Sequence, residues 1–407
     1  MQRLWPLWRL AQAIQWLVLF VSFYQTFITI AGQIAGALQR RDASPPPARP
    51  VRFTLIVCAR NEARVIGQLL DDLLAQEYPR DALQLLVVAH NCEDATAAVA
   101  ARPGVRVIEA RTAQPGKRHA IRAALPHIPS DCEAIGVLDA DSRVDATFLA
   151  AVAAAIEGET CIQVETVPQP SEGWLSHGYG LDRRARNLLW WKPRENLGLG
   201  VTASGSGFFL RASMARQLVP ELHAVTEDLE LTALLALAGH RVRFLSTTRI
   251  RLQEPHGLRP LVRQRARWAR GHFGVARQVV PPLLARALRG DLRAADLALY
   301  LVLPTRVLTR TAVTLALFST LVGAPWRLPL RAALAGMAGE WLVPAALAAH
   351  ARLVPLNLQG LRLAARLGVI GLLWFPIGVW AAVTSRNSSW DHTPREIHDG
   401  DRSLPVT

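Results

Sequence analysis

A short apolar run that ends in two carboxylates constrains this chain most. Residues 134–138 are apolar enough for a buried parallel strand, and Asp139 and Asp141 follow directly. In an open α/β sheet, ligands lie beyond the carboxyl ends of the strands. Two acids there repel each other unless a cation lies between them, so the pair predicts Mg²⁺ or Mn²⁺ holding a phosphorylated ligand. A helix-capping role for one Asp is less favoured, because Asp145 precedes the helical run 146–156 and is expected to cap it.

Segments on both sides of this run alternate between strand-like and helix-like patterns. Short apolar runs predict the strands, and apolar residues spaced three and four apart predict the helices. We expect strands over 53–58, 83–88, 105–108, 134–138 and 160–167. We expect helices over 65–74, 118–124, 146–156 and 226–238. This alternation predicts an α/β fold with a mostly parallel sheet covered by helices.

Composition limits the classes of partner. The 407 residues are 51% hydrophobic and carry a formal charge of +14, which leaves room for one catalytic domain plus membrane segments. Arginine supplies nearly all of the positive charge and flanks apolar runs, which favours anionic headgroups and phosphates. No basic tract with interleaved aromatics is present, so no nucleic-acid partner is expected. The four cysteines are widely spaced, as suits reduced thiols in a cytosolic domain rather than disulfides or a zinc site.

Long apolar stretches predict membrane segments toward both ends of the chain. Residues 10–38 carry no formal charge, and about 20 apolar residues suffice to span a bilayer. A cleaved signal peptide is the alternative for this stretch. Further candidates are 295–323, 332–350 and 367–385, and whether the last one spans decides on which side of the membrane the polar tail lies.

The predicted organisation has six parts. The tract 44–50 is rich in proline and predicts a stiff linker, and 258–278 is strongly basic. The segment 174–191 is amphipathic, which an interfacial helix and an ordinary surface helix explain equally well. We expect an N-terminal transmembrane helix, a linker, a soluble domain, a basic interfacial segment, C-terminal transmembrane or interfacial helices and a polar tail, over 1–42, 43–50, 51–257, 258–290, 291–386 and 387–407.

Four motifs stand in one order along the chain. They are Arg60-Asn61-Glu62, Asp139-Ala140-Asp141, Thr226-Glu227-Asp228 and Gln264-x-x-Arg267-Trp268. Together they resemble the membrane-bound family 2 glycosyltransferases, which include cellulose, hyaluronan, chitin-oligosaccharide and poly-N-acetylglucosamine synthases. The resemblance covers residues 50–275, with Trp390-x-x-Thr393-x-Arg395 in the tail. It implies a GT-A-type, Rossmann-like nucleotide-sugar domain with N- and C-terminal transmembrane helices.

The resemblance also implies a role for each matching position. Asp228, with Glu227 beside it, would be the general base that deprotonates the acceptor hydroxyl, and Arg267 would hold the departing diphosphate. Asp141, with Asp139, would hold the Mg²⁺ or Mn²⁺ ion. The positions implied to bind the nucleotide sugar are Ala59, Arg60, Glu62, Asn91, Asp94, Lys117, Asp139 and Ala140. Those implied to bind the acceptor are Gly205, Ser206, Gly207, Gln264 and Trp268.

The chain departs from the family pattern after the second strand. His90 stands where the family commonly carries an Asp in the turn that contacts uracil, although the closing acid Asp94 remains. A UDP-linked donor is therefore the expectation, with a guanine or thymine nucleotide left open. Lys117 is followed by Arg118 and His119 rather than by small residues.

Ordinary structural roles remain open for three of these motifs. Thr226 followed by two acids also suits a helix N-terminus, through capping and the helix dipole. Arg267 and Trp268 also suit headgroup anchors, and Lys117 suits a solvated turn.

The sequence favours an inverting transferase that moves a sugar from a nucleotide-diphospho donor to a growing polysaccharide or oligosaccharide. Transfer of one sugar to a lipid acceptor is the alternative, and a non-catalytic transport or scaffold protein is a remote one. A glycoside hydrolase is disfavoured because its paired acids would not lie one residue apart. The expected location is the cytosolic face of a bacterial inner membrane. Few membrane helices are expected, so export of a polymer would need a homo-oligomer or a partner.

Overall fold

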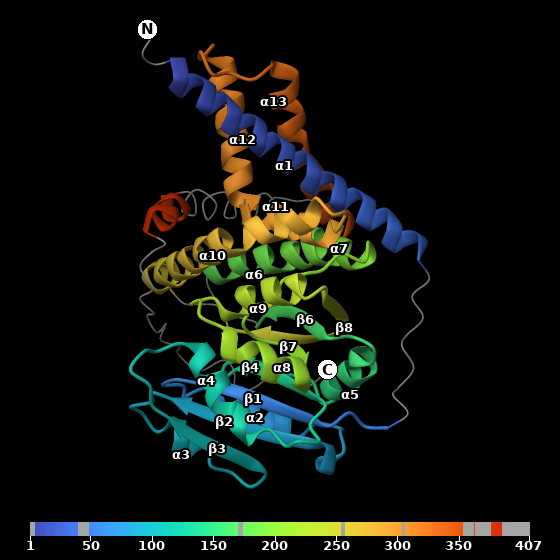
Figure 1. Ribbon diagram of the computed structural model, residues 1–407, viewed down its shortest axis with the longest axis vertical. Helices are drawn as coiled ribbons and strands as arrows, with labels where there is room; N and C mark the ends of the chain where they lie inside the picture. Colours follow the sequence, from blue (N-terminus) through green and yellow to red (C-terminus); the bar gives the residue numbers. More distant parts are fainter. Residues whose placement is uncertain are drawn as a thin grey trace. The chain divides into compact units, whose positions relative to one another are not determined.

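The computed structural model describes residues 5–39, 49–169, 174–253, 257–302, 306–352, 362 and 376–384. Within these residues the chain forms two compact units (Figure 1). The first, here called the sheet unit, has its described residues within 41–183 and 200–275. The second, the helical unit, comprises the residues up to 40 together with 184–199 and 276–384.

The sheet unit is built on a mixed sheet of eight strands in the described part of the chain. In spatial order these are β3 (Val105–Ala110), β2 (Leu83–His90), β1 (Phe53–Ala59), β4 (Ala134–Asp139), β7 (Phe208–Arg211), β6 (Cys161–Pro168), β8 (Val242–Leu252) and β5 (Arg143–Val144). The first four run parallel, β7 is antiparallel to both of its neighbours, β6 and β8 run parallel, and β5 is antiparallel to β8. The predicted α/β class with a mostly parallel sheet is confirmed.

Amphipathic helices cover this sheet. They are α2 (Ile66–Leu74), α3 (Thr96–Ala100), α4 (Lys117–Ala124), α5 (Phe148–Ile156), α8 (Ala212–Leu218) and α9 (Glu227–Leu237). In α2, the apolar face predicted from the spacing is buried. Helix α9 also ends next to its predicted bound at 238, because Gly239 follows it with φ +87°, a conformation that favours glycine.

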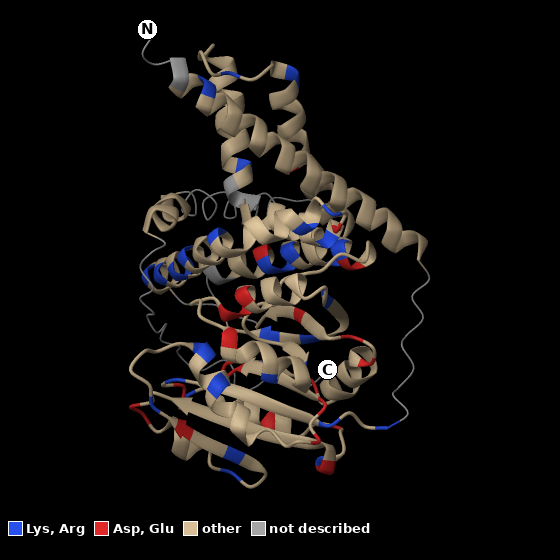
Figure 2. Cartoon of the chain, in the orientation of Figure 1, with Lys and Arg blue, Asp and Glu red and all other residues tan. Residues whose placement is uncertain are grey.

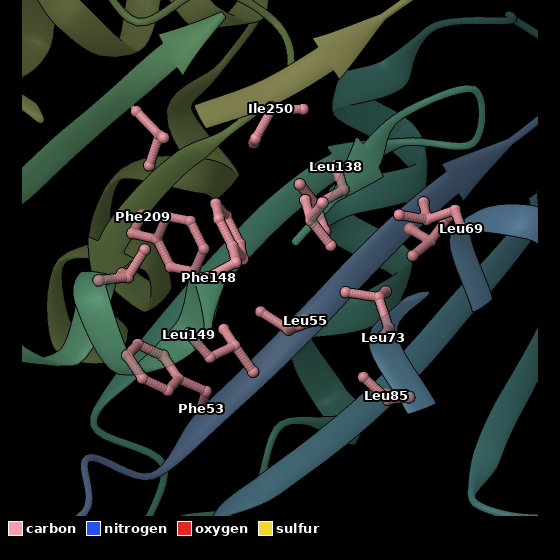
Figure 3. Close-up of a cluster of buried hydrophobic side chains, with 14 of the residues drawn as sticks. Phe53, Leu55, Leu69, Leu73, Leu85, Leu138, Phe148, Leu149, Phe209 and Ile250 are labelled. Carbon is pink, nitrogen blue, oxygen red and sulfur yellow. The ribbon is translucent and has the colours of Figure 1, made fainter. Parts of the chain in front are cut away.

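The core of the sheet unit lies between the sheet and these helices, as Figure 3 shows for its larger side chains. Phe209 of β7 lies 5.7 Å from Phe148 of α5 and 5.8 Å from Phe53 of β1, measured between ring centroids. This packing needs a glycine in β4, because a Cβ at Gly136 would lie 2.5 Å from Phe209 and 2.7 Å from Leu55. Burial of each large side chain contributes about 1.5–3 kcal/mol.

The strand register brings three strand ends to one end of the sheet. Cys58 of β1 lies opposite Val88 of β2 on one side and Asp139 of β4 on the other. Because these strands are parallel, the segments that follow them leave the sheet at the same place. The predicted site residues after β1, β2 and β4 therefore share one end of the sheet.

The predicted helix cap at Asp145 is wrong. Helix α5 begins at Phe148, and Thr147 before it makes no side-chain capping bond. The Asp145 carboxylate instead accepts a hydrogen bond from Arg251 Nη2 (2.8 Å), because β8 pairs with β5 beside it. Neither of these two strands is among the predicted ones.

The helical unit contains α1 (Trp5–Leu38), a π-helical segment (Asn187–Trp191), α7 (Lys192–Asn196), α11 (Leu292–Val302), α12 (Arg306–Leu321), α13 (Leu330–Met337), a second π-helical segment (Ala338–Leu342) and α14 (Val343–His350). Helices α6 (Trp174–Arg186) and α10 (Leu258–Ala287) run from the sheet unit into this one. The Arg194 guanidinium forms a buried ion pair with Asp296 (2.8 Å), and Tyr24 Oη donates to the same carboxylate (3.0 Å). A buried pair with its hydrogen bonds made ties α7 and α11 to α1.

Among the described residues of the helical unit, two helical stretches are long and apolar enough to cross a membrane, Leu7–Leu38 and Leu330–His350. They coincide with the stretches predicted at 10–38 and 332–350. The stretch predicted at 295–323 is divided between α11 and α12, with 303–305 outside the described residues. Of 367–385, only 376–384 is described, as helix, and the tail with Trp390 lies outside the described residues.

Candidate functional site

Lys117, the first residue of α4, joins two segments that are far apart in the sequence. Its ammonium, Nζ, donates to Asp139 Oδ1 (2.5 Å) at the end of β4 and to Gly205 O (2.7 Å). The side chain is 14% exposed, so Lys117 is not the solvated turn lysine that the sequence left open.

Gly205 lies between two carboxylates. Its φ is +58°, and a Cβ placed on it would lie 3.7 Å from Asp228 Oδ2 and 3.9 Å from Asp139 Oδ2. The start of α9, the end of β4 and the start of α4 therefore meet around one backbone turn. We call Lys117, Asp139, Gly205 and Asp228 the carboxylate–lysine cluster.

The turn 203–207 is fixed by hydrogen bonds to β4. Ser206 Oγ accepts from the Asp139 backbone N–H (3.0 Å) and lies 2.9 Å from Ser142 Oγ. Gly207 has φ +80°, and a Cβ on it would lie 2.4 Å from Ile250 of β8. The structure thus brings Gly205 to Gly207 to the cluster, and their predicted contact with the acceptor stays a prediction.

Burial controls the charge of the acids in this cluster. Loss of hydration raises the pKa of Asp228, while N–H donors of Leu229 and Gly205 and the Lys117 charge act to lower it. Burial, and then the charge of Asp228, raises the pKa of Glu227 to about 8. Burial acts against the charge of Lys117, yet Asp139 and the other neighbouring acids raise the pKa of its ammonium. A proton held by the buried Glu227 removes a neighbouring negative charge, which favours the ionised form of the half-buried Asp228.

The chemistry of the donor set fits a hard divalent cation. Asp141 is 5% exposed, and its carboxylate follows Asp139 at the mouth of β4. In the described part of the chain, no three His, Cys, Asp or Glu side chains are arranged to hold a metal ion by themselves. Mg²⁺ commonly uses one or two carboxylates and takes its other ligands from phosphates and water. The pair fits an ion shared with a diphosphate.

The segments after β1 and β2 are tied to each other. The Asp94 carboxylate accepts from the Ala63 N–H (3.1 Å), and Thr96 Oγ1 accepts from the Glu62 N–H (2.8 Å). The Asn91 side chain donates to Thr112 O (3.0 Å) and accepts from the Thr112 N–H (2.9 Å). These partners give Asn91 and Asp94 a structural task. Nucleotide contacts by them, and by Ala59, Arg60, Glu62 and Ala140 at the same end of the sheet, remain predictions.

His90, at the end of β2, is held in one tautomer. Thr112 Oγ1 donates its single proton to Gln114 O (2.6 Å), so the 2.8 Å contact between Thr112 Oγ1 and His90 Nε2 is donated by the histidine. Burial, followed by the charges of His119 and Arg60, lowers the pKa of His90 to about 4. The neutral ring therefore carries a lone pair on Nδ1, an acceptor like the carboxylate that the family pattern has here.

Helix α10 packs against the residue that precedes the two acids of α9. A Cβ at Gly271 would lie 2.4 Å from Thr226 Cγ2, so only glycine allows this approach. Gln264 and Arg267 lie seven and four residues before Gly271, on the same face of the helix. Gln264 is 7% exposed, whereas Trp268 is 36% exposed with the Arg265 guanidinium 4.6 Å from its ring. The structure thus brings the helix that carries this motif to the start of α9, and the roles of the motif at the leaving group and acceptor stay predictions.

Comparison with known proteins gives the family. The model of glycosyltransferase-like family 2 matches residues 49–271, more than half of the 407-residue chain. A beta-monoglucosyldiacylglycerol synthase of Synechocystis sp. is 26% identical over 241 residues, which are 57% of this chain and 50% of that protein. The probable glycosyltransferase YdaM of Bacillus subtilis is 25% identical over 250 residues, 54% of this chain and 55% of that protein. The chain thus spans about half the length of these relatives.

A solved structure shows the same fold. A mannosyltransferase of Pyrobaculum calidifontis, in complex with GDP-Man and Mn²⁺, matches with a TM-score of 0.57 at 20% identity, covering 91% of this chain and 99% of that one. This likeness concerns the fold, and the family match supplies the class of enzyme. The chain belongs to glycosyltransferase-like family 2 and has the GT-A fold.

Proposed function

We propose that this enzyme transfers a single sugar from a nucleotide-diphospho sugar to a hydroxyl group of a membrane lipid, with inversion at the anomeric carbon. The carboxylate–lysine cluster carries the proposal, because it places two half-buried carboxylates next to a cation and a glycine turn. The relatives named as glucosyldiacylglycerol synthases favour a lipid acceptor over the polysaccharide acceptor expected from the sequence. A UDP-linked donor remains the working choice.

In the proposed reaction, Asp228 is the general base. The acceptor oxygen attacks the anomeric carbon, its proton passes to the Asp228 carboxylate, and the bond to the diphosphate oxygen breaks. A pKa raised by burial makes this carboxylate a stronger base than an exposed aspartate. Inversion follows from a single displacement without an enzyme nucleophile.

Cationic groups would stabilise the negative charge that develops on the leaving diphosphate. Lys117 supplies a compact positive charge held at the mouth of β4. Arg267 would add a planar guanidinium from α10. A divalent ion on Asp139 and Asp141 would neutralise phosphate charge as a Lewis acid.

Membrane association is part of the proposal. Two helical stretches are long and apolar enough to span a bilayer. Figure 2 shows basic residues recurring along α10, all of them arginines, in a helix without an acidic residue, which suits the surface of anionic lipids. We place the enzyme at the cytosolic face of a bacterial inner membrane. A single transfer to lipid needs neither the oligomer nor the export partner considered for a polymer.

The test is product analysis with the purified protein in detergent. UDP-glucose, UDP-N-acetylglucosamine and GDP-mannose are supplied in turn with diacylglycerol, with and without Mn²⁺. The proposal predicts metal-dependent release of nucleoside diphosphate with one donor and a single glycolipid product. A ladder of products would support polysaccharide synthesis instead, and absence of release with every donor and acceptor would contradict the proposal.

A further inference from the structure

Arg122 of α4 holds a stretch of backbone that leads into Asp228. Residues 219–226, here called the base-leading segment, comprise a short 3-10 turn and the connection to α9. The Arg122 guanidinium donates from Nε to Val219 O (3.2 Å) and from Nη2 to Pro220 O (2.6 Å) and to Leu222 O. One side chain thus meets three carbonyls of this segment, and a guanidinium suits this geometry because its donors are fixed in one plane.

Two further charged side chains, Arg118 and Glu230, hold the same segment, and we call them together with Arg122 the clamp. Arg118, one turn before Arg122, donates from Nη1 to Ala224 O (3.1 Å). Glu230 of α9 accepts at Oε2 from the N–H groups of His223 (2.7 Å) and Ala224 (2.7 Å). The carbonyls of the base-leading segment therefore meet cations of α4, and its amides meet an anion of α9. Charge-assisted bonds of this kind are stronger than bonds between neutral groups.

The clamp links two parts of the carboxylate–lysine cluster through one helix. Lys117 stands at the start of α4, and the base-leading segment ends at Thr226, two residues before Asp228. A rotation or shift of α4 would thus move the donor-side cation and the proposed base together. Nothing in the motifs of the sequence assigns a task to these two arginines.

We propose that Arg118 and Arg122 are positioning residues that hold Asp228 in register with Lys117 and Asp139. The inference rests on the proposed function for the role of Asp228, while the clamp itself rests on the hydrogen bonds of the base-leading segment. The two arginines touch backbone, so they act on the reaction through the position of Asp228.

The experiment compares Arg122→Gln and Arg118→Gln with Arg102→Gln. Arg102 is a matched control because it also donates to two backbone carbonyls, Val99 O (3.1 Å) and Gly67 O (3.3 Å), but holds α2 to α3. We expect Arg122→Gln to lower kcat about 10- to 100-fold with little change in donor KM, because a displacement of about 1 Å suffices for such a loss. Arg122→Lys should recover part of kcat, since its ammonium still reaches a carbonyl.

A second readout does not depend on turnover. Hydrogen exchange at the amides of His223 and Ala224 should quicken in Arg122→Gln and stay unchanged in Arg102→Gln. Unchanged exchange, or kcat and Tm losses equal to those of Arg102→Gln, would overturn the inference. If wild-type protein shows no transfer, the proposed function fails, whereas the clamp is still decided by exchange.

Discussion

At the scale of single residues, Asp228 at the start of α9 sets the expected dependence on pH. Asp228 must be ionised to accept a proton, and burial raises its pKa above the ordinary 3.8. A raised pKa keeps the carboxyl protonated up to a higher pH, so kcat should fall as pH drops through a midpoint above the ordinary aspartate range. Because the Lys117 charge lowers the pKa of Asp228, Lys117→Met should move this midpoint to still higher pH. The measurement is the pH dependence of kcat.

The informative quantity is the pH at the midpoint of the fall in kcat. The maximal rate is less informative, because we also expect Lys117→Met to weaken donor binding. A midpoint in the ordinary aspartate range, or one that moves to lower pH in Lys117→Met, would contradict the assignment of Asp228.

His90 provides a second test at this scale. Its neutral ring offers Nδ1 as an acceptor, and we predict that it accepts an N–H of the donor's base. His90→Phe should weaken binding of the nucleoside diphosphate about tenfold, the loss expected for one hydrogen bond of about 1.4 kcal/mol. Binding of pyrophosphate, which lacks a base, should be unchanged. Calorimetry on both ligands gives the comparison.

The control for this variant is His127→Phe. The His127 ring contacts Arg106 Nη2 (2.8 Å) near the amino end of β3, away from the carboxyl ends of the strands where the nucleotide is expected. Equal nucleotide affinity in His90→Phe and wild-type protein would remove His90 from base recognition.

At the scale of elements, the contact between α10 and α9 depends on one glycine. Gly271→Ala would place a Cβ 2.4 Å from Thr226 Cγ2, so the helix must move away from the residue preceding the two acids. We expect a loss of about 1–3 kcal/mol in the free energy of unfolding, as for other overpacked sites, with a fall in kcat. Thr226→Ser removes the obstructing methyl group. The double variant Gly271→Ala/Thr226→Ser should therefore recover part of the free energy of unfolding and part of kcat.

Gly200→Ala is the matched control, because its nearest neighbour, Arg241 Cβ, lies at an ordinary 3.5 Å. Chemical denaturation and initial rates are measured on Gly271→Ala, Thr226→Ser, their double variant and Gly200→Ala. If Gly271→Ala had the same stability and kcat as Gly200→Ala, the close approach of α10 to Thr226 would have no role.

The sequence predicts the elements whose signals are local. β1, β2 and β4 are apolar runs, and the acid at the end of β4 marks the ligand end of the sheet. β8 is missed because Ser246, Thr247 and Thr248 interrupt the alternation of apolar and polar residues in its middle, and it is held by pairing with β6. Long-range pairing of this kind leaves no pattern in a single segment.

The sequence predicts which residues form the candidate site, but it does not predict which of them contact each other. The motifs indicate Asp139 and Asp228, and the family resemblance indicates Lys117, yet Lys117 meets Gly205 across 88 residues of chain, which depends on the whole sheet. The clamp by Arg118 and Arg122 is missed because an arginine that binds carbonyls has no sequence signature beyond its helical spacing.

At the scale of the whole molecule, the chain combines a GT-A sheet unit with a helical unit that contains two apolar helical stretches. α1 exposes a row of large apolar side chains, among them Phe20, Phe23 and Phe27, as a helix in contact with lipid does. A transferase bound to a membrane encounters its lipid acceptor by diffusion within the plane of that membrane, which suits the proposed glycolipid product. The same chain spans about half the length of the relatives that it matches.

The most direct test of the central claim is Asp228→Asn. Asn has nearly the same shape as Asp but cannot take up the proton of the acceptor hydroxyl. We expect transfer to be abolished, while nucleoside diphosphate binding and Tm stay near those of wild-type protein. Asp145→Asn, at an exposed ion pair with Arg251, is the control and should retain full transfer. Retained turnover in Asp228→Asn would show that the carboxylate–lysine cluster does not hold the base.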